Sequence, residues 1–145
     1  MKRNVRLTFH LILTGLIICS ILSCKKHSTS TDYAPKPDPA ILGLWSHYFK
    51  LNSITVKYYL RFKNSGKFDA AYSEDSLDLV TDYGSFSTNG NEIVMIDADN
   101  APNSVCKSMK GIYTYSFQGN TMILTTVSDT CYTRSYSTPG LWTKN

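Results

Sequence analysis

Charge is scarce in this chain, and the part from Ile41 onward carries no excess of one sign. Only 18% of the 145 residues are charged, as 15 basic and 11 acidic side chains. From Ile41 onward there are nine basic and nine acidic residues, so this part of the chain is neutral. Affinity for nucleic acid depends on the dense neutralisation of phosphates by Lys and Arg. We therefore expect no nucleic-acid partner.

Histidine and catalytic motifs are scarce as well. The chain has 3 histidines, and only His47 lies beyond residue 40. No G-x-S-x-G, P-loop or dinucleotide-binding motif occurs in the sequence. A nucleophile is usually activated by a histidine base, and a structural zinc ion needs four ligands. We therefore expect no enzyme, no metal site and no cofactor.

Two clusters of acidic residues are the remaining candidates for chemistry. Residues 74–82 contain four carboxylates, a type of residue that forms the catalytic pair of glycoside hydrolases. Their loop-like surroundings favour a solvated, charged surface instead. The run Asp97-Ala98-Asp99-Asn100 begins like a calcium-binding loop, but Pro102 and Ser108 stand where an EF-hand requires Gly and Glu. We interpret this run as a turn.

Long apolar runs are absent except for one near the N-terminus. Three basic residues within the first six precede the run Leu11–Leu22, which is too short to cross a bilayer comfortably. A basic start, a short apolar run and a small residue before the cleavage point are typical of a secretory signal. The segment ends in Ile21-Leu22-Ser23-Cys24, which resembles the lipobox of bacterial lipoproteins. An ordinary secretory signal or a short membrane anchor is the alternative.

The lipobox resemblance implies that residues 1–23 are a signal peptide and that Cys24 carries the lipid, palmitate included. An acylated cysteine buries enough methylene groups for stable anchoring in a membrane. The start Cys24-Lys25-Lys26 is similar to that of many lipoproteins of the Bacteroidota. The resemblance implies a protein of the cell envelope, held by its anchor in the outer membrane and facing the periplasm or the cell surface.

Residues 24–40 have the composition of a tether. After Cys24 they contain Ser, Thr, Lys, Asp and three alternating prolines, with almost nothing apolar. Such a segment cannot bury enough surface to offset the entropy of the chain, and its prolines favour an extended form. We place the folded domain at residues 41–145. The alternative assigns Tyr33 to a first strand.

Strand patterns dominate the domain. Val56, Tyr58, Leu60 and Phe62 stand at alternate positions, which is the period of a half-buried strand. A turn at Asn64-Ser65-Gly66 follows, and its glycine permits the positive φ that a short hairpin needs. Two later segments, with turns at Gly90-Asn91 and Gly119-Asn120, repeat an order of aromatic strand, Gly-Asn turn and aliphatic strand. The sequence therefore predicts successive hairpins.

These hairpins predict an all-β fold. Opening and closing strands over residues 41–50 and 132–143 bring the number to about eight strands. Sequential hairpins favour an antiparallel up-and-down meander, which can close into a small β-barrel that leaves no sheet edge exposed. A two-layer sandwich is the alternative. We also expect a short helix within residues 73–80.

An ordered set of motifs resembles the lipocalins and the lipocalin-like lipoproteins of bacteria. A G-x-W motif opens the domain, as in lipocalins, and a second hairpin with an L-x-F and a G-x-F motif follows. The long helix near the end of lipocalins has no counterpart here. The resemblance covers residues 41–144. It is carried by Gly43-x-Trp45, Leu60-x-Phe62, Gly66-x-Phe68, Cys106, Gly111–Thr121, Cys131 and Arg134.

The resemblance implies roles for particular residues. In lipocalins an arginine near the last strand stacks on the first tryptophan, so Arg134 is expected to close the barrel against Trp45, beside Gly43. A ligand-lining role for Arg134 is the alternative. The residues expected to face inward and line a ligand site are Tyr58, Leu60, Phe62, Phe68, Tyr113, Tyr115 and Phe117.

Two functions fit such a barrel. The first is a binding module, anchored in the membrane by its lipid, for a small hydrophobic ligand. The second is a protein-interaction or inhibitory domain whose barrel is filled by its own side chains. A cavity of a few hundred cubic ångström would favour the first. We expect a monomer in either case.

The cysteines have separate expected fates. Cys19 leaves with the signal peptide and Cys24 takes the lipid, so Cys106 and Cys131 remain as a pair. A compartment outside the cytoplasm permits a disulfide between them. Free or redox-active thiols are the alternative.

Overall fold

The structure is a computed structural model that describes residues 36–79 and 82–145. The predicted signal peptide, the lipidated Cys24 and most of the predicted tether lie outside the described residues. No helix within the described residues is long and apolar enough to cross a membrane.

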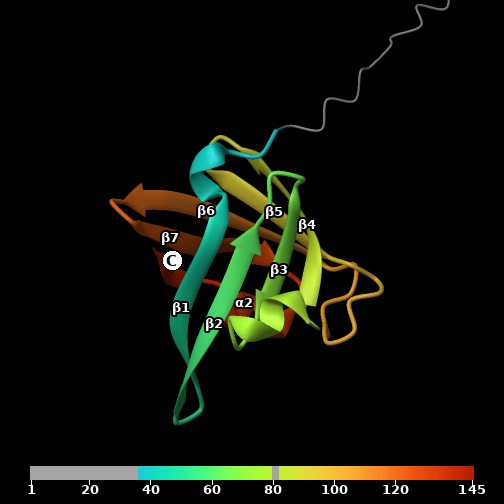
Figure 1. Cartoon of the computed structure of the whole chain (residues 1–145). Coiled ribbons are helices and arrows are strands. Elements are labelled where there is room, and N and C mark those ends of the chain that lie inside the picture. The colour runs from blue at the N-terminus through green and yellow to red at the C-terminus, as the bar shows by residue number, and fades with distance from the viewer. Residues whose placement is uncertain (1–35, 80–81) are drawn as a thin grey trace, which may run out of the picture. The chain divides into compact units, whose positions relative to one another are not determined.

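The described residues form an all-β, antiparallel barrel that closes on itself, as Figure 1 shows. Each strand pairs with the next along the chain, and the last pairs with the first through Trp45↔Lys144 and Ser46↔Thr143. The predicted up-and-down meander and small lipocalin-like barrel are therefore confirmed, and the sandwich is excluded. The strands are β1 (Gly43–Leu51), β2 (Ile54–Phe62), β3 (Lys67–Ala71), β4 (Asp82–Asn89), β5 (Glu92–Asp97), β6 (Lys110–Gln118), β7 (Thr121–Asp129) and β8 (Gly140–Lys144).

Three of the hairpin turns lie where glycine predicted them, whereas the turn between β1 and β2 uses Asn52. Gly66, Gly90 and Gly119 have φ angles of 71°, 58° and 59°, in the left-handed region that glycine adopts most readily. All three lie at the end of the barrel that also carries the 3₁₀ helix η1 (Pro39–Ile41). We call this the η1 end. The opposite end carries the 3₁₀ helix η2 (Asp75–Asp78), the loop 98–109 and the helix α2 (Tyr132–Ser137), and we call it the α2 end (Figure 1).

Two elements differ from the prediction. The closing strand was expected over 132–143, but its first half is α2, and β8 begins only at Gly140. Residues 132–139 have no strand partner, because the pairing of β7 with β8 ends at Leu124↔Gly140. The short helix expected within 73–80 is η2, a single 3₁₀ turn that buries Leu77.

The hydrophobic core fills the η1 end and continues into the inner wall of the α2 end. Trp45, with 1% of its surface exposed, donates its indole N–H to the carbonyl oxygen of Ile41 at 2.7 Å. The rings of Phe62 and Phe86 pack edge to face, with centroids 4.8 Å apart. Aromatic rings bury large apolar areas, and their buried polar atoms need such partners. The other fully enclosed members of this core include Ile41, Ile93, Met95, Tyr113, Met122, Leu124 and Trp142.

The folded unit begins before the predicted boundary at Ile41. The backbone N–H of Asp38 donates to the Thr88 hydroxyl at 2.9 Å, and the Tyr115 hydroxyl donates to the Asp38 carboxylate at 2.8 Å. Burial and then this hydrogen bond raise the pKa of Tyr115 to about 12. The last residues of the predicted tether are therefore part of the η1 end.

Candidate ligand-binding site

A cavity of about 450 Å³ opens at the α2 end of the barrel. Its deeper wall is apolar and comes from the inward faces of β2, β3 and β5, through Leu60, Phe68, Ala70 and Met95. The outer wall comes from the loop after β3, the loop 98–109 and α2. The outer residues are Ala71, Tyr72, Ser73, Ser76, Asp82, Asp97, Asn103, Ser104, Val105, Cys106, Thr133, Arg134, Ser137 and Thr138, with Tyr58 from β2.

The space arises from small side chains on one wall. Ala70 lies opposite Leu60 in the pairing of β2 with β3, where the η1 end instead pairs Phe62 with Phe68. An alanine fills far less of the barrel interior than an aromatic ring does. The close-packed side chains around it do not fill the volume that a ring would occupy. The change from Phe to Ala along β3 therefore opens the α2 end.

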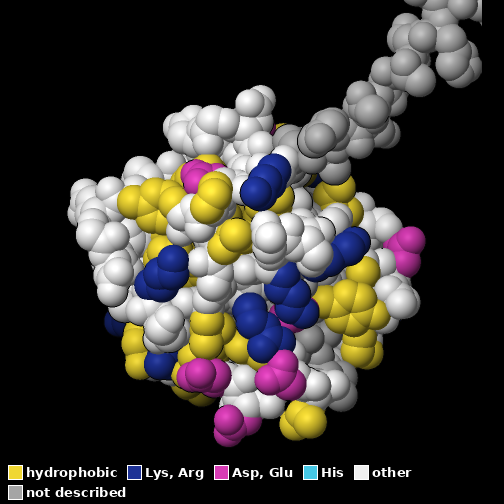
Figure 2. Space-filling view, turned by 45° about the horizontal axis from the view of Figure 1, so that its top comes forward, with side chains coloured by type: hydrophobic (Ala, Val, Ile, Leu, Met, Phe, Trp, Pro, Cys, Tyr) yellow, Lys and Arg dark blue, Asp and Glu magenta, His cyan; other side chains and the backbone are white. Residues whose placement is uncertain are grey.

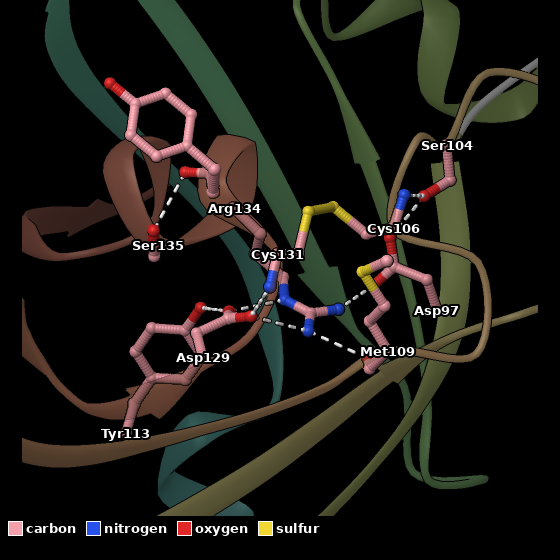
Figure 3. A network of polar contacts seen from close by, with 10 residues as sticks. Asp97, Ser104, Cys106, Met109, Tyr113, Asp129, Cys131, Arg134 and Ser135 are labelled. Carbon is pink, nitrogen blue, oxygen red and sulfur yellow. Dashed lines mark hydrogen bonds and ion pairs between the residues drawn. A yellow bond between two sulfur atoms is a disulfide. The ribbon is translucent and has the colours of Figure 1, made fainter.

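A buried guanidinium forms the polar wall of the cavity. Arg134 from α2 makes a two-pronged contact with Asp129 at the end of β7, at 2.7 Å from Nε and 3.0 Å from Nη2. Its Nη1 binds Asp97 at the end of β5, and its Nη2 also donates to the carbonyl oxygen of Met109 at 2.8 Å. Figure 3 shows the guanidinium between the two carboxylates. Arg134 thus ties α2 to two strands and to the loop that precedes β6.

Electrostatics keep this network charged. Burial alone would lower the pKa of Arg134, but the hydrogen bond to Asp129 and the charges of Asp97 and Asp129 raise it. Burial alone would raise the pKa of Asp129, but hydrogen bonds from Arg134 and Tyr113 hold it below the ordinary value. A buried ion pair of this kind is costly to break, because the partner left behind is an unpaired buried charge.

A disulfide closes the same wall. Cys106 in the loop 98–109 is bonded to Cys131, the residue just before α2, with their Cα atoms 5.4 Å apart. The pair lies beside the Arg134 network in Figure 3. Ser104 reinforces the loop by donating to Asp97 at 2.5 Å and accepting from the backbone N–H of Cys106 at 2.9 Å. The predicted Cys106–Cys131 disulfide is confirmed.

Asp82, the first residue of β4, is a cavity-lining carboxylate without a matching partner. Its Oδ1 atom is buried, and no described residue gives it a hydrogen bond. Burial and then the nearby charge of Asp97 raise the pKa of Asp82. Buried polar atoms of proteins nearly always have a partner, so the enclosed and unpaired Oδ1 of this cavity-lining residue is a notable exception.

Aromatic rings gather beside Asp82. The ring centroids of Tyr58 and Tyr72 are 5.2 Å apart, and Tyr58 also lies 6.1 Å from Trp142. Burial, and then the charge of Asp82, raise the pKa of Tyr58, so its hydroxyl stays neutral. The cavity thus combines an aromatic face with an acidic group.

The structure brings together only part of the predicted ligand-lining set. Tyr58, Leu60 and Phe68 line the cavity, and their contact with a ligand stays a prediction. Phe62, Tyr113 and Tyr115 belong to the hydrophobic core but do not border the cavity. Phe117 lies near the end of β6, partly exposed, with its ring 6.0 Å from that of Trp45.

The predicted stacking of Arg134 on Trp45 is wrong. Arg134 lies at the α2 end in ion pairs with Asp97 and Asp129, whereas Trp45 is held by Ile41 at the η1 end. The cation over the Trp45 ring is the ammonium group of Lys144, 5.2 Å from the centroid. Gly43 permits this approach, because a Cβ there would lie 3.3 Å from Lys144 Cε. The alternative position, with Arg134 lining the cavity, is the one observed.

Asp82 and Asp97 also line the cavity, although the sequence pointed to them only as members of acidic clusters and not as ligand-lining residues. For Asp97 a signal was present: Ile93, Met95 and Asp97 stand at alternate positions of β5, and all three are buried. Asp99, the other carboxylate of the weighed calcium loop, accepts a hydrogen bond from Ser108. Within the described residues no group of three or more His, Cys, Asp or Glu side chains is placed to hold a metal ion.

Fold and site together define a small, closed antiparallel barrel that is filled at one end and hollow at the other. Comparison with protein-family models, with curated proteins and with solved structures finds no match.

Proposed function

We propose that this chain is a lipocalin-like lipoprotein of the cell envelope whose barrel binds a small hydrophobic ligand at the α2 end. The observation that carries the proposal is the cavity of about 450 Å³. Sites for small molecules typically enclose about 300 to 1,000 Å³ and combine apolar walls with a few polar groups. Leu60, Phe68, Ala70 and Met95 supply such walls, and Asp82 supplies a polar group.

The proposed location rests on the sequence. The lipobox-like segment ending at Cys24 supports an anchor in the outer membrane, and the Cys106–Cys131 disulfide suits an oxidising compartment. Replacing Cys24 by Ser should move the protein from the detergent phase to the aqueous phase in a phase-partition assay. The Cys19→Ser variant is the matched control and should stay in the detergent phase. Continued partitioning of the Cys24→Ser protein into detergent would exclude the anchor.

We propose a binding role rather than catalysis. His47, the only histidine among the described residues, packs on Trp142 with ring centroids 4.8 Å apart. Burial lowers the pKa of His47, against the effect of its hydrogen bond with Leu141, so the ring is neutral at neutral pH. These surroundings fit a structural role for His47 better than a role as a general base.

Native mass spectrometry tests ligand binding directly. The full-length protein, purified from its own host, should carry a small molecule that denaturation releases. Ala70→Trp places an indole in the cavity and should abolish this extra mass. Ala40→Trp, a substitution of the same size at an exposed residue of η1, should keep it. No bound molecule in either the unchanged protein or Ala40→Trp would contradict the proposal.

A protein-interaction domain is the second candidate, and exposed apolar side chains at the α2 end favour it. Tyr132, Leu79, Val105 and Ile54 have 82%, 79%, 70% and 69% of their surfaces exposed. Isolated exposed apolar residues are ordinary, but several at one end of a small domain are typical of contact surfaces. A partner that still binds Ala70→Trp and is lost with Tyr132→Ser and Leu79→Ser would support this candidate.

The face shown in Figure 2 gives no sign of a partner of one charge. Figure 2 shows Lys and Arg side chains lying among Asp, Glu and hydrophobic ones on the face it presents. This mixture agrees with the equal numbers of basic and acidic residues from Ile41 onward. We propose a monomer that contacts the membrane through its anchor and does not bind nucleic acid.

A further inference from the structure

We propose that the cavity at the α2 end selects ligands that carry a protonated amine on an apolar body and rejects carboxylates. This inference rests on the proposed ligand-binding function and specifies its ligand class. Its basis is the juxtaposition of an unpartnered carboxylate, two tyrosine rings and an apolar inner wall around one space.

The charge of the site is negative. Asp82 and Asp97 line the cavity, and Arg134 is the only cationic residue among the described ones that line it. The guanidinium of Arg134 is occupied by Asp97, Asp129 and the carbonyl oxygen of Met109. Three carboxylates therefore stand against one guanidinium. A ligand carboxylate would meet repulsion from Asp82 and would find the arginine already bound.

Asp82 is the cavity-lining carboxylate that still lacks a hydrogen-bond donor at its Oδ1 atom. Asp97 is bound by Arg134 and Ser104, whereas Oδ1 of Asp82 is buried with no hydrogen bond from a described residue. The Asp82 side chain borders the cavity and is partly withdrawn from water, so a donor that a ligand brings to this carboxylate gains more there than in water. A protonated amine offers both the donor and the opposite charge.

The aromatic wall favours the same ligand. Tyr58 and Tyr72 line the cavity with ring centroids 5.2 Å apart, and Tyr58 contacts Trp142 behind it. The face of an aromatic ring attracts cations, most strongly where water is excluded. Leu60, Phe68 and Met95 form the apolar inner wall of the cavity, which can contact the apolar body of the ligand.

Three straight-chain compounds of eight carbons each, with an amine, a hydroxyl or a carboxylate as the head group, are the probes for this inference. Octylamine, octanol and octanoate should be titrated calorimetrically into the full chain carrying Cys24→Ser, so that no acyl chain competes for the cavity. We expect octylamine to bind at least about tenfold more tightly than octanol, as expected for a gain of one charge-assisted contact. Octanoate should bind more weakly than octanol.

The variant Asp82→Asn identifies the group responsible. It keeps the shape of the side chain, so we expect affinity for octylamine to fall about tenfold while affinity for octanol stays within about twofold. Asp75→Asn removes the same charge from an exposed residue of η2 and should leave both affinities unchanged. Lowering the pH through the raised pKa of Asp82 should weaken octylamine binding to the unchanged chain and to Asp75→Asn, but not to Asp82→Asn.

The possible outcomes distinguish a failure of the inference from a failure of the proposed function. If octanol or octanoate binds as tightly as octylamine, or Asp82→Asn changes nothing, the amine inference fails while ligand binding stands. If none of the three compounds binds, both fail. The comparison of head groups on the unchanged domain needs no substitution at Asp82, so a folding defect in that variant cannot obscure the result.

Discussion

The two ends of the barrel are stabilised in different ways. At the η1 end, Trp45, Phe62 and Phe86 fill the interior, and the few polar atoms among them find nearby oxygen acceptors. At the α2 end, small side chains such as Ala70 leave the interior open, and a disulfide and the Arg134 ion pairs hold the wall together. Packing thus stabilises one end, and cross-links stabilise the other.

This contrast explains why charged residues lie inside a small domain. An open interior has fewer apolar contacts to hold its walls, so the segments around it need connections of another kind. Arg134 ties α2 to the ends of β5 and β7 and to the residues before β6, and the disulfide ties α2 to the loop 98–109. The α2 end can therefore be hollow without losing its shape.

Removing the central cation should have the largest effect on the α2 end. Arg134→Met should lower the free energy of unfolding by about 3 to 5 kcal/mol, because it leaves Asp97 and Asp129 as unpaired buried carboxylates. Urea unfolding of the purified protein measures this loss. Arg61→Met removes a partly exposed arginine from its ion pairs with Asp69 and Asp78, and should cost clearly less. Equal losses would mean that Arg134 is not the main connection.

Removing the central ring should affect the η1 end to a similar or slightly smaller extent. Trp45→Ala should cost about 3 to 5 kcal/mol, since a large buried ring leaves a cavity. Tyr48→Ala, on the same strand but exposed, should change the free energy of unfolding by less than about 1 kcal/mol.

The two ends should also be energetically independent. Because Trp45 and Arg134 lie at opposite ends, the losses from Trp45→Ala and Arg134→Met should add in the double variant to within about 0.5 kcal/mol. A coupling well above that value would indicate contact between them, contrary to the structure.

Removing the disulfide should have an intermediate effect that is confined to one end. The bond closes a loop with a sequence separation of 25, which corresponds to about 3.5 kcal/mol in the chain-entropy model. In the variant with Cys106→Ser and Cys131→Ser, amide hydrogen exchange should accelerate in α2 and the loop 98–109. Exchange in the paired parts of β1 and β2 near Gly43 should change only as much as global stability does. Uniform acceleration throughout the barrel would remove the distinction between the ends.

The smallest effect is expected for the cation over Trp45. Lys144→Gln should cost about 0.5 to 1 kcal/mol, from the lost contact of the ammonium group with the indole face. Lys50→Gln, an exposed lysine of β1, is the control and should cost less. If the two substitutions cost the same, the position of Lys144 over the ring contributes nothing measurable.

Most strands and turns of the barrel could be predicted from the sequence, because apolar residues alternate along the strands and glycine marks most of the turns. The alternation through Leu60 and Phe62 and the turns at Gly66, Gly90 and Gly119 agree with the structure. The helix α2 was missed because a single short turn of Thr, Tyr and Ser has no apolar period, and its buried residues are Arg134 and Ser137.

The site was harder to predict than the fold. In the sequence, Asp97 and Arg134 cannot be distinguished from solvated charges, because these two partners are 37 positions apart. Alternation indicates which residues face inward but not how deep they lie. Tyr113 and Leu60 both face inward, yet only Leu60 borders the cavity. Depth depends on the register of all the strands together.

Backbone NMR during a titration with octanol tests the central claim most directly, because this neutral compound does not depend on selection by Asp82. With an open α2 end and a filled η1 end, the saturable shifts should centre on the amides of Leu60, Ala70 and Met95 and on α2. The amides of Gly66, Gly90 and Gly119 at the η1 end should stay unchanged. Shifts centred on the η1 end, or none at saturating octanol, would contradict a barrel that binds ligands at its α2 end.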